Sequence, residues 1–359
     1  MPAREGSLSS RAALPSKEIN MMKLAGRLET PYLVSQALQG NLPGDPVERM
    51  LPVYLPPGYD ENPSRRYPVI YFLAGHGGSG PLLLAPVAWG ESFPERFDRL
   101  MRTGAMGPAI VVMPDCFTIF GGAQYLNSSA LGQYEDYFID ELIPYVDATY
   151  RTLPVREHRA LSGKSSGGYG TMVQTMRHPE LFSAFASHSG DCYFDLSYIP
   201  DIAKLHANLM RFGGLEGFIA QVPTFKPKTH DPFFSVIGML CYGAAYAPNP
   251  DAPRGFDMPI DMETGALRED VWQRWLAWDP VRMIDRPEYV DAWRQMKYVY
   301  LDCGLWDELS LQIGARLISK KLTALGIKHD FELFNDGHIN VQYRNDVSLP
   351  RLEAAIRAT

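Results

Sequence analysis

The sequence lacks the features that mark several large classes of protein. Its 359 residues contain only four cysteines, and no two of them form a C-x-x-C pair. Neither a metal site built on such pairs nor a disulfide framework is therefore indicated. Lysine and arginine form no dense run, and the net charge is −7. This balance argues against nucleic acid and anionic membranes as partners, because both require a basic face.

Long apolar runs are also missing. The first 26 residues contain no apolar segment of the kind found in a secretory signal. The longest uncharged segment lies between Asp231 and Asp251 and is interrupted by glycines and prolines. It is shorter than the roughly 18 continuous apolar residues that a membrane span requires. We therefore expect a cytoplasmic protein with reduced thiols and no membrane partner.

What the sequence does contain is an alternation of strand-like and helix-like segments. Alternating β and α units predict a mostly parallel central sheet with helices on both faces. The expected strands are 49–55, 67–75, 109–115, 158–163, 183–190, 296–304 and 327–334. The expected helices are 133–150, with a bend or an end at Pro144, and 167–178, 309–326 and 349–359.

Two regions depart from this alternation. Residues 1–40 are weakly patterned and are expected to form an N-terminal extension to an α/β domain at 41–359. Residues from about 192 to 292 are rich in proline, aromatics and methionine. We predict that they form a cap over the carboxyl edge of the sheet, where ligand sites of α/β proteins lie. The alternative is an extra structural subdomain with no part in a site.

A glycine-rich run at 162–170, SGKSSGGYG, could serve two kinds of chemistry. A phosphate-binding loop requires G-x-x-x-x-G-K-[ST]. Gly163, Lys164 and Ser165 supply its end, but His158 stands where its first glycine should be. A residue with a ring cannot readily adopt the backbone conformations that glycine does, so we reject a phosphate loop.

The same run matches the nucleophile elbow G-x-S-x-G. Gly163 and Gly167 flank Ser165 at the required positions, between a predicted strand and a predicted helix. Small residues at these positions allow the strand and the helix to approach closely around a strained serine. Ser166 would have Lys164 as its upstream flank, so the pattern selects Ser165 as the nucleophile.

A second glycine-rich run, at 75–80, formally matches the dinucleotide-binding pattern G-x-G-x-x-G. That pattern requires a helix directly after it, and here Pro86 and Gly90 interrupt the following segment. We reject a nucleotide site and predict that the turn helps to form an oxyanion hole. The expected donors are the backbone N–H of His76 or Gly77 together with that of Ser166.

The general base of such an enzyme follows the acid in chain order. His338 lies on a loop after the last predicted strand, beside Gly337, and can reach over Ser165. His188, which closes the strand after the elbow, could instead line the pocket.

For the acid, Asp307 follows the strand 296–304 and precedes the base. Asp302 lies too far inside that strand, and Asp336 is too near His338 in sequence. Asp191 is the rival, because it ends the preceding strand.

Together these segments resemble a known family. RMLPVYLPPGYDENPSRRYPVIYFLAGHGGSG, GKSSGG and LDCGLWDELSLQIGARLISKKLTALGIKHDFELFNDGH are similar to the putative esterase family of α/β-hydrolases, over about residues 45–345. That family includes esterase D, enterochelin esterase-like, feruloyl esterase and mycolyltransferase members. The resemblance implies an α/β-hydrolase fold, a triad of Ser165, Asp307 and His338, and an oxyanion donor in the turn after the strand 67–75. The chain departs from the family pattern at Ala74, before Gly75, and at Asp336.

These observations predict a serine esterase that acts through an acyl-enzyme and needs neither a metal nor an organic cofactor. The expected substrate is a small or medium apolar or aromatic ester, bound by Phe233, Met239, Tyr242 and Trp306. An acyltransferase with the same triad and a non-catalytic binding protein are the alternatives. A homodimer formed through the insertion or the N-terminal segment is compatible with the sequence, which does not specify it.

Overall fold

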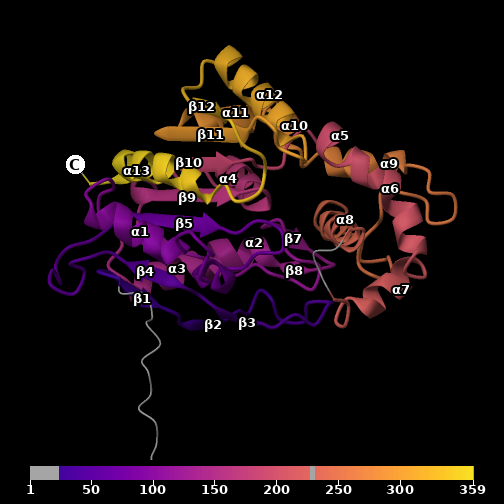
Figure 1. Cartoon of the computed structure of the whole chain (residues 1–359), viewed down its shortest axis with the longest axis horizontal. Coiled ribbons are helices and arrows are strands. Elements are labelled where there is room, and N and C mark those ends of the chain that lie inside the picture. Colours follow the sequence, from indigo (N-terminus) through magenta and orange to yellow (C-terminus); the bar gives the residue numbers. More distant parts are fainter. Residues whose placement is uncertain (1–23, 227–230, 359) are drawn as a thin grey trace, which may run out of the picture.

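The computed structural model describes residues 24–226 and 231–358, and its centre is a twisted sheet of eight strands (Figure 1). Residues 1–23 of the predicted extension lie outside the described residues. In spatial order the strands are β1 (Arg27–Glu29), β4 (Val53–Leu55), β6 (Ile110–Val112), β5 (Val69–Leu73), β9 (Arg159–Lys164), β10 (Ala184–His188), β11 (Tyr298–Gly304) and β12 (Asp330–Phe334).

The six strands from β6 to β12 in this order run parallel, and β4 pairs antiparallel with both β1 and β6. Every residue of β5 and β10 is buried, as expected for strands covered on both faces. Two short hairpins lie outside the sheet: β2 (Tyr32–Val34) with β3 (Glu48–Met50), and β7 (Asn127–Ser128) with β8 (Gly132–Gln133). The predicted mostly parallel α/β sheet is present.

Helices cover the two faces of the sheet, and a large hydrophobic cluster lies on each face. On one face, α1 (Phe93–Arg102) and α13 (Asn345–Ile356) pack against side chains that include Ile70 and Phe72. The other face, which includes Tyr71 of the same strand, packs against a second set of helices. These are α2 (Tyr134–Asp136), α3 (Ile143–Thr149), α4 (Ser166–Arg177) and α12 (Leu311–Ala324).

Two predicted helices differ in detail from the observed ones. The segment 133–150 is not interrupted at Pro144; a π-helical turn at Tyr137–Leu142 joins α2 to α3. Pro144, which has no N–H to donate, comes directly after the π-helical turn, where the hydrogen-bond register of the helix changes. The last helix begins at Asn345 rather than at 349.

The predicted boundary at residue 40 does not separate an extension from the domain in the described part of the chain. Arg27–Glu29 forms β1, which pairs antiparallel with β4 at the edge of the main sheet. A three-residue strand is too short to give a clear period-two pattern in the sequence, which explains why it was not predicted.

The insertion between β10 and β11 folds as helices. Five of them lie to one side of the sheet in Figure 1: α5 (Phe194–Ser197), α6 (Ile199–Met210), α7 (Gly214–Gln221), α8 (Phe233–Tyr246) and α9 (Glu269–Leu276). The last two, α10 (Pro280–Met283) and α11 (Pro287–Arg294), return to the sheet.

The contacts of α11 show that the insertion is not all cap. The ring of Trp293 packs 5.0 Å from that of Phe185 in β10, and its Nε1–H donates to Thr175 in α4. The cap therefore comprises α5–α9 and ends near Leu276, before the predicted limit of 292. No helix within residues 24–226 and 231–358 is both long and apolar enough to cross a bilayer.

Candidate active site

The turn between β9 and α4 places Ser165 in a strained backbone conformation. Its φ is 57° and its ψ is −126°, values that a residue with a side chain seldom adopts. A Cβ atom at Gly163 would lie 2.5 Å from the backbone of Gly167, and one at Gly167 would lie 2.0 Å from the carbonyl oxygen of Leu73. Both glycines are therefore required for the strand and the helix to meet around this serine.

Three side chains from three different loops are linked by hydrogen bonds at this turn. The Nε2 atom of His338 lies 3.1 Å from the Oγ of Ser165, and its Nδ1 lies 2.8 Å from the Oδ2 of Asp307. A carboxylate can only accept, so Nδ1 carries the proton and Nε2 is free to accept one from the serine. The structure thus brings together the three residues that the sequence proposed as the triad.

The position of Asp307 suits an ionised carboxylate that orients a histidine. It is buried, which by itself would raise its pKa, but the hydrogen bond and charge of His338 and the N–H of Leu309 hold that pKa below the usual value. The loop that carries the histidine has a second attachment: the N–H of His338 donates to Glu308 at 2.7 Å. Glu308, whose role sequence reasoning missed, thus fixes the backbone of the base.

Asp191, the rival acid, lies near this group but has different partners. Its Oδ2 accepts hydrogen bonds from Ser166 and Tyr198, both at 3.1 Å. Burial raises its pKa, although the charge of His338 and the hydrogen bond from Ser166 oppose the shift. The acid that contacts the histidine is Asp307.

Of the three backbone N–H groups predicted as oxyanion donors, one already donates a hydrogen bond within the protein and two do not. The N–H of Gly77 donates to the carbonyl of Gly121 at 2.7 Å, so it cannot also serve a ligand. Among the described residues, the N–H groups of His76 and Ser166 have no acceptor. Ser166 is the first residue of α4, where the helix dipole adds positive charge.

The turn after β5 packs directly on the elbow. A Cβ at Gly75 would lie 3.3 Å from the Cβ of Ser165. This close approach places the backbone of His76 beside the serine. The pair of donors available here is therefore His76 and Ser166, and Gly77 is corrected to a structural role.

The sequence predicts only a backbone donor at His76. In the structure its imidazole also contacts aromatic rings of the cap. Its ring lies 5.4 Å from that of Phe234 and 5.8 Å from that of Tyr242, both in α8. Burial lowers the pKa of His76 to about 4, so the ring is neutral near pH 7. This side chain joins the sheet domain to the cap.

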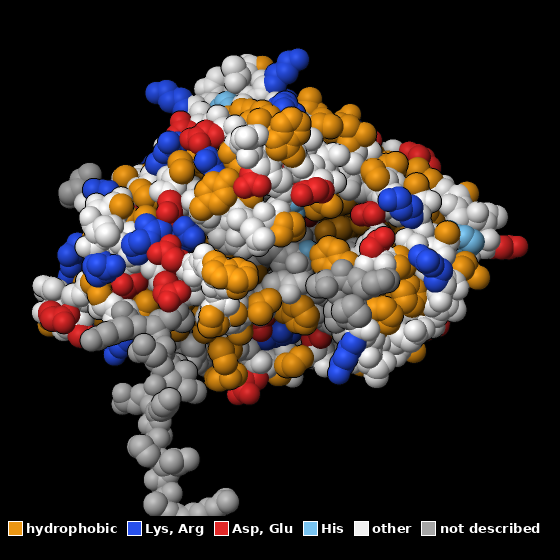
Figure 2. All heavy atoms as spheres, viewed as in Figure 1, with side chains coloured by type: hydrophobic (Ala, Val, Ile, Leu, Met, Phe, Trp, Pro, Cys, Tyr) orange, Lys and Arg blue, Asp and Glu red, His pale blue; other side chains and the backbone are white. Residues whose placement is uncertain are grey.

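A cavity of about 600 Å³ opens above Ser165 and His338. Its walls are mainly apolar and come from the turn after β5, the loop before α1, helix α8 and the loop after β12. The apolar side chains include Leu82, Leu83, Val87, Phe93, Phe234, Tyr242 and Ile339. The polar ones include Ser79, Lys164, Glu308 and Gln342. Figure 2 shows this face hollowed between the cap and the sheet.

Two of the four predicted pocket residues lie elsewhere. Trp306 is 69% exposed, and its indole N–H donates to Asn335 at the surface. Phe233 is buried in the cap, stacked on Phe225. Consecutive residues of a helix face different sides, so its neighbour Phe234 faces the cavity. Tyr242 lines the cavity as predicted, and Met239 lines a second cavity beside it.

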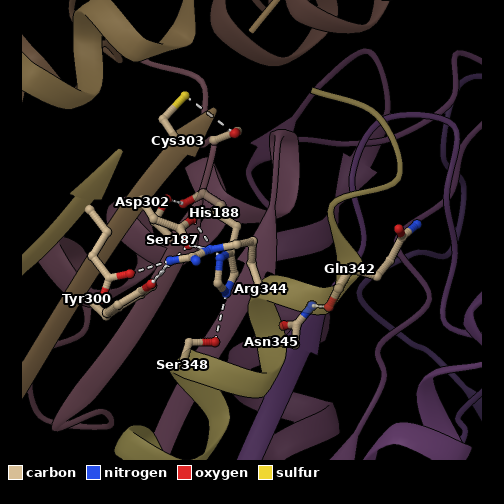
Figure 3. A network of polar contacts seen from close by, with 12 residues as sticks. Ser187, His188, Tyr300, Asp302, Cys303, Gln342, Arg344, Asn345 and Ser348 are labelled. Carbon is tan, nitrogen blue, oxygen red and sulfur yellow. Dashed lines mark hydrogen bonds and ion pairs between the residues drawn. The ribbon is translucent and has the colours of Figure 1, made fainter. Parts of the chain in front are cut away.

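His188 does not line the pocket. Its Nδ1 lies 2.7 Å from Asp302 and its Nε2 lies 2.8 Å from Ser348 in α13, within the core (Figure 3). Arg344 completes the network by donating to Asp302 at 2.8 Å. The carbonyl of His188 accepts the N–H of Ser165. This network supports the elbow from behind.

No group of three or more histidine, cysteine, aspartate or glutamate side chains within the described residues could hold a metal ion. The described residues that line the cavity and have nucleophilic or titratable side chains include Ser165, His338, Glu308 and Lys164. Burial lowers the pKa of Lys164, although the nearby carboxylate of Asp307 opposes this shift.

Two curated relatives match part of the chain. A protein of Xylanibacter ruminicola named endo-1,4-beta-xylanase/feruloyl esterase is 33% identical over 153 residues, which are 39% of this chain and 19% of the relative. An esterase of Mycobacterium tuberculosis is 32% identical over 172 residues, 45% of this chain and 34% of the relative. The matched parts are thus well under half of both relatives.

Solved structures resemble the whole architecture. A ferulic acid esterase has a TM-score of 0.61 at 20% identity, covering 93% of this chain and 100% of that one. An S-formylglutathione hydrolase from Agrobacterium tumefaciens has a TM-score of 0.54 at 14% identity, covering 93% and 97%. These likenesses and the sheet order confirm the predicted α/β-hydrolase fold.

The family comparison covers most of the sequence. Residues 46–346 match the family described as "Putative esterase", and this range includes the elbow, the cap and the loops that carry Asp307 and His338. The chain belongs to that family of α/β-hydrolases.

Proposed function

We propose that this protein hydrolyses carboxylic esters with Ser165 as the nucleophile. The observation that carries the proposal is the hydrogen-bonded series from Ser165 through His338 to Asp307 at the floor of an open cavity. Membership of an esterase family and the names of the relatives support the same reaction class.

In the first half of the reaction, the Oγ of Ser165 attacks the ester carbonyl carbon while Nε2 of His338 takes its proton. Asp307 stabilises the imidazolium that forms. The N–H groups of His76 and Ser166 bind the negative oxygen of the tetrahedral intermediate. The carbon–oxygen bond to the leaving group then breaks, and the imidazolium gives its proton to the departing alcohol.

In the second half, water attacks the acyl-serine and His338 takes a proton from it. The bond to the Oγ of Ser165 breaks, the serine regains its proton, and the carboxylic acid leaves. The cavity opens to solvent, so water can reach the acyl-serine.

The cavity favours a small or medium ester with apolar or aromatic parts. Phe234, Tyr242 and Leu83 offer apolar surface close to Ser165, and burial of such surface contributes roughly 25 cal/mol per Å². Similar proteins are named feruloyl esterase or ferulic acid esterase, and the feruloyl group is aromatic. These names are consistent with an aromatic acyl group in the substrate.

Labelling with a fluorophosphonate probe, followed by mass spectrometry of the tryptic peptides, tests the nucleophile. We expect the label on Ser165 alone. The variant Ser165→Ala should not be labelled, and its kcat for p-nitrophenyl acetate should fall by about 10⁴-fold or more. Normal turnover by a correctly folded Ser165→Ala protein would refute the proposal.

A further inference from the structure

A second cavity, of about 250 Å³, lies beside the first and beneath the cap. His76, Phe234, Tyr242 and Leu309 line both cavities and form the boundary between them. Ser165 and His338 line the first cavity and not the second. We call this second cavity the acyl chamber.

The position of the general base, His338, determines which part of an ester substrate would occupy each cavity. His338 gives a proton to the leaving oxygen, so the departing alcohol must lie on the side of His338, in the first cavity. The acyl chamber is lined by the oxyanion donor His76 and by Asp191, which accepts from Ser166, and His338 does not line it. The acyl part of the substrate is the part that can enter it.

Among the described residues, the carboxylic side chains that line the acyl chamber have no basic partner of lysine or arginine in the same lining. Asp191, Asp201 and Asp231 line it, whereas no described lysine or arginine does. His76, which also lines it, is neutral near pH 7 because burial lowers its pKa to about 4. In Figure 2 acidic side chains appear around the hollow between the cap and the sheet.

Asp191 lines this chamber and has one carboxylate oxygen with no hydrogen bond to a described residue. It is only 2% exposed, and its Oδ2 accepts from Ser166, Tyr198 and Gln124. Its Oδ1 receives no hydrogen bond from any described residue. A carboxylate oxygen that has no donor within the protein can accept a hydrogen bond from a bound ligand or pair with a bound cation.

Aromatic rings line the chamber together with the carboxylates. The rings of Tyr198 and Tyr242 stack with centroids 4.5 Å apart, and both residues line the chamber. Phe234 lines it as well and is 44% exposed. Carboxylates combined with aromatic faces are the chemistry that binds ammonium groups, through ion pairing and cation–π attraction.

We propose that the acyl chamber binds an ammonium group carried by the acyl part of the substrate. Asp191 supplies the buried negative charge, Asp201 adds charge from helix α6, and Tyr198, Tyr242 and Phe234 supply aromatic faces. This assignment rests on the proposed ester hydrolysis and narrows its substrates to esters of amino or quaternary ammonium acids.

Two p-nitrophenyl esters of equal shape test the proposal. One is the ester of 4-(trimethylammonio)butanoic acid, and the other is the ester of 5,5-dimethylhexanoic acid, in which carbon replaces the charged nitrogen. Each kcat/KM is divided by the rate of hydroxide-catalysed hydrolysis of the same ester, to remove the intrinsic effect of the charge. We expect the wild-type enzyme to prefer the cationic ester by about tenfold or more.

Removing the carboxylates should abolish this preference. In Asp191→Asn the ratio of the two corrected kcat/KM values should fall to about one, and in Asp201→Asn it should fall by a few fold. The ratio is independent of any general loss of activity that Asp191→Asn causes through Ser166. Asp251→Asn, which removes an exposed carboxylate from the cap outside the chamber, is the matched control and should keep the wild-type ratio.

The outcomes separate this assignment from the function on which it rests. Equal or better hydrolysis of the neutral ester by the wild-type enzyme overturns the ammonium site and leaves ester hydrolysis intact. An unchanged ratio in both Asp191→Asn and Asp201→Asn also overturns it. Failure to hydrolyse either ester, with no fluorophosphonate labelling of Ser165, overturns the proposed function itself.

Discussion

Two sets of serine, histidine and aspartate in this molecule have nearly the same internal distances. In the first, His338 lies 3.1 Å from Ser165 and 2.8 Å from Asp307. In the second, His188 lies 2.8 Å from Ser348 and 2.7 Å from Asp302 (Figure 3). By hydrogen-bond geometry alone the second set is the tighter of the two.

The surroundings distinguish them. Ser348 is completely buried inside helix α13, while Ser165 lies on a strained turn and lines an open cavity. Asp302 is shared with Arg344 and Tyr300, so its charge is already balanced inside the protein. The proposed reaction at Ser165 therefore requires access to the cavity, free N–H donors and an acid that no arginine already pairs with, and the distances are only one of the requirements.

The largest difference between the two sets is expected in how strongly a substitution of the aspartate lowers the turnover rate. In Asp307→Asn the side chain can no longer select the His338 tautomer or stabilise its charged form, so kcat should fall by about 10⁴-fold with the fold retained. Steady-state hydrolysis of p-nitrophenyl acetate, with circular dichroism as the check on folding, measures this.

Asp191→Asn is the control for the choice of acid. It should retain far more activity on p-nitrophenyl acetate than Asp307→Asn does, because Asp191 makes no hydrogen bond to His338. A near-normal rate in Asp307→Asn together with a large loss in Asp191→Asn would transfer the role to Asp191.

Disrupting the second set, formed by Ser348, His188 and Asp302, should lower the stability of the protein. Asp302→Asn leaves the guanidinium of Arg344 without its buried anionic partner and weakens the hold on His188. Breaking a buried pair in this way costs about 3 kcal/mol of unfolding free energy. Urea unfolding measures the loss, and kcat of the folded variant should stay within a few fold of wild type. A large fall in kcat with unchanged stability would instead give Asp302 a part in catalysis.

The pH dependence of this stability has a definite sign. Burial alone would raise the pKa of Asp302, but the charge and hydrogen bond of His188 and the hydrogen bond from Arg344 hold it below its ordinary value. The stabilisation is thus complete above the unfolded pKa of about 3.9 and is lost as the pH falls through the folded one. The difference in unfolding free energy between wild type and Asp302→Asn should shrink below about pH 4.

Asp191 should behave in the opposite way, because burial raises its pKa. Its ionisation costs stability as the pH rises through the raised value, so Asp191→Asn should gain stability relative to wild type between acidic and neutral pH. Urea unfolding over a pH series measures both trends, and parallel curves for the two variants would contradict them.

Much of the fold and the reacting groups could be predicted from the sequence because their patterns are local. The glycines at 163 and 167 are required by steric contacts within a few residues of Ser165, and a motif records such contacts directly. Strands buried on both faces leave continuous apolar runs, as in β5.

The rest depends on contacts between distant segments. Nothing near Gly77 in the sequence indicates that its N–H is taken by Gly121, and nothing in the cap distinguishes the buried Phe233 from Phe234 at the cavity. From the sequence, His188 was predicted as a possible pocket residue. In the structure its Nε2 instead pairs with Ser348 in α13, a helix that begins more than 150 residues later in the chain. Such pairings are set by tertiary packing, which one sequence does not display.

The smallest effect is expected for a substitution of Ser348, the serine of the second set. Ser348→Ala removes one buried hydroxyl and leaves Nε2 of His188 without a partner, which costs about 1–3 kcal/mol of unfolding free energy. Turnover should remain within about twofold of wild type, because Ser348 touches no part of the cavity. Ser165→Ala should show the reverse, a loss of turnover with stability within about 0.5 kcal/mol of wild type. If Ser348→Ala lost activity without losing stability, access to solvent would not be what separates the two sets.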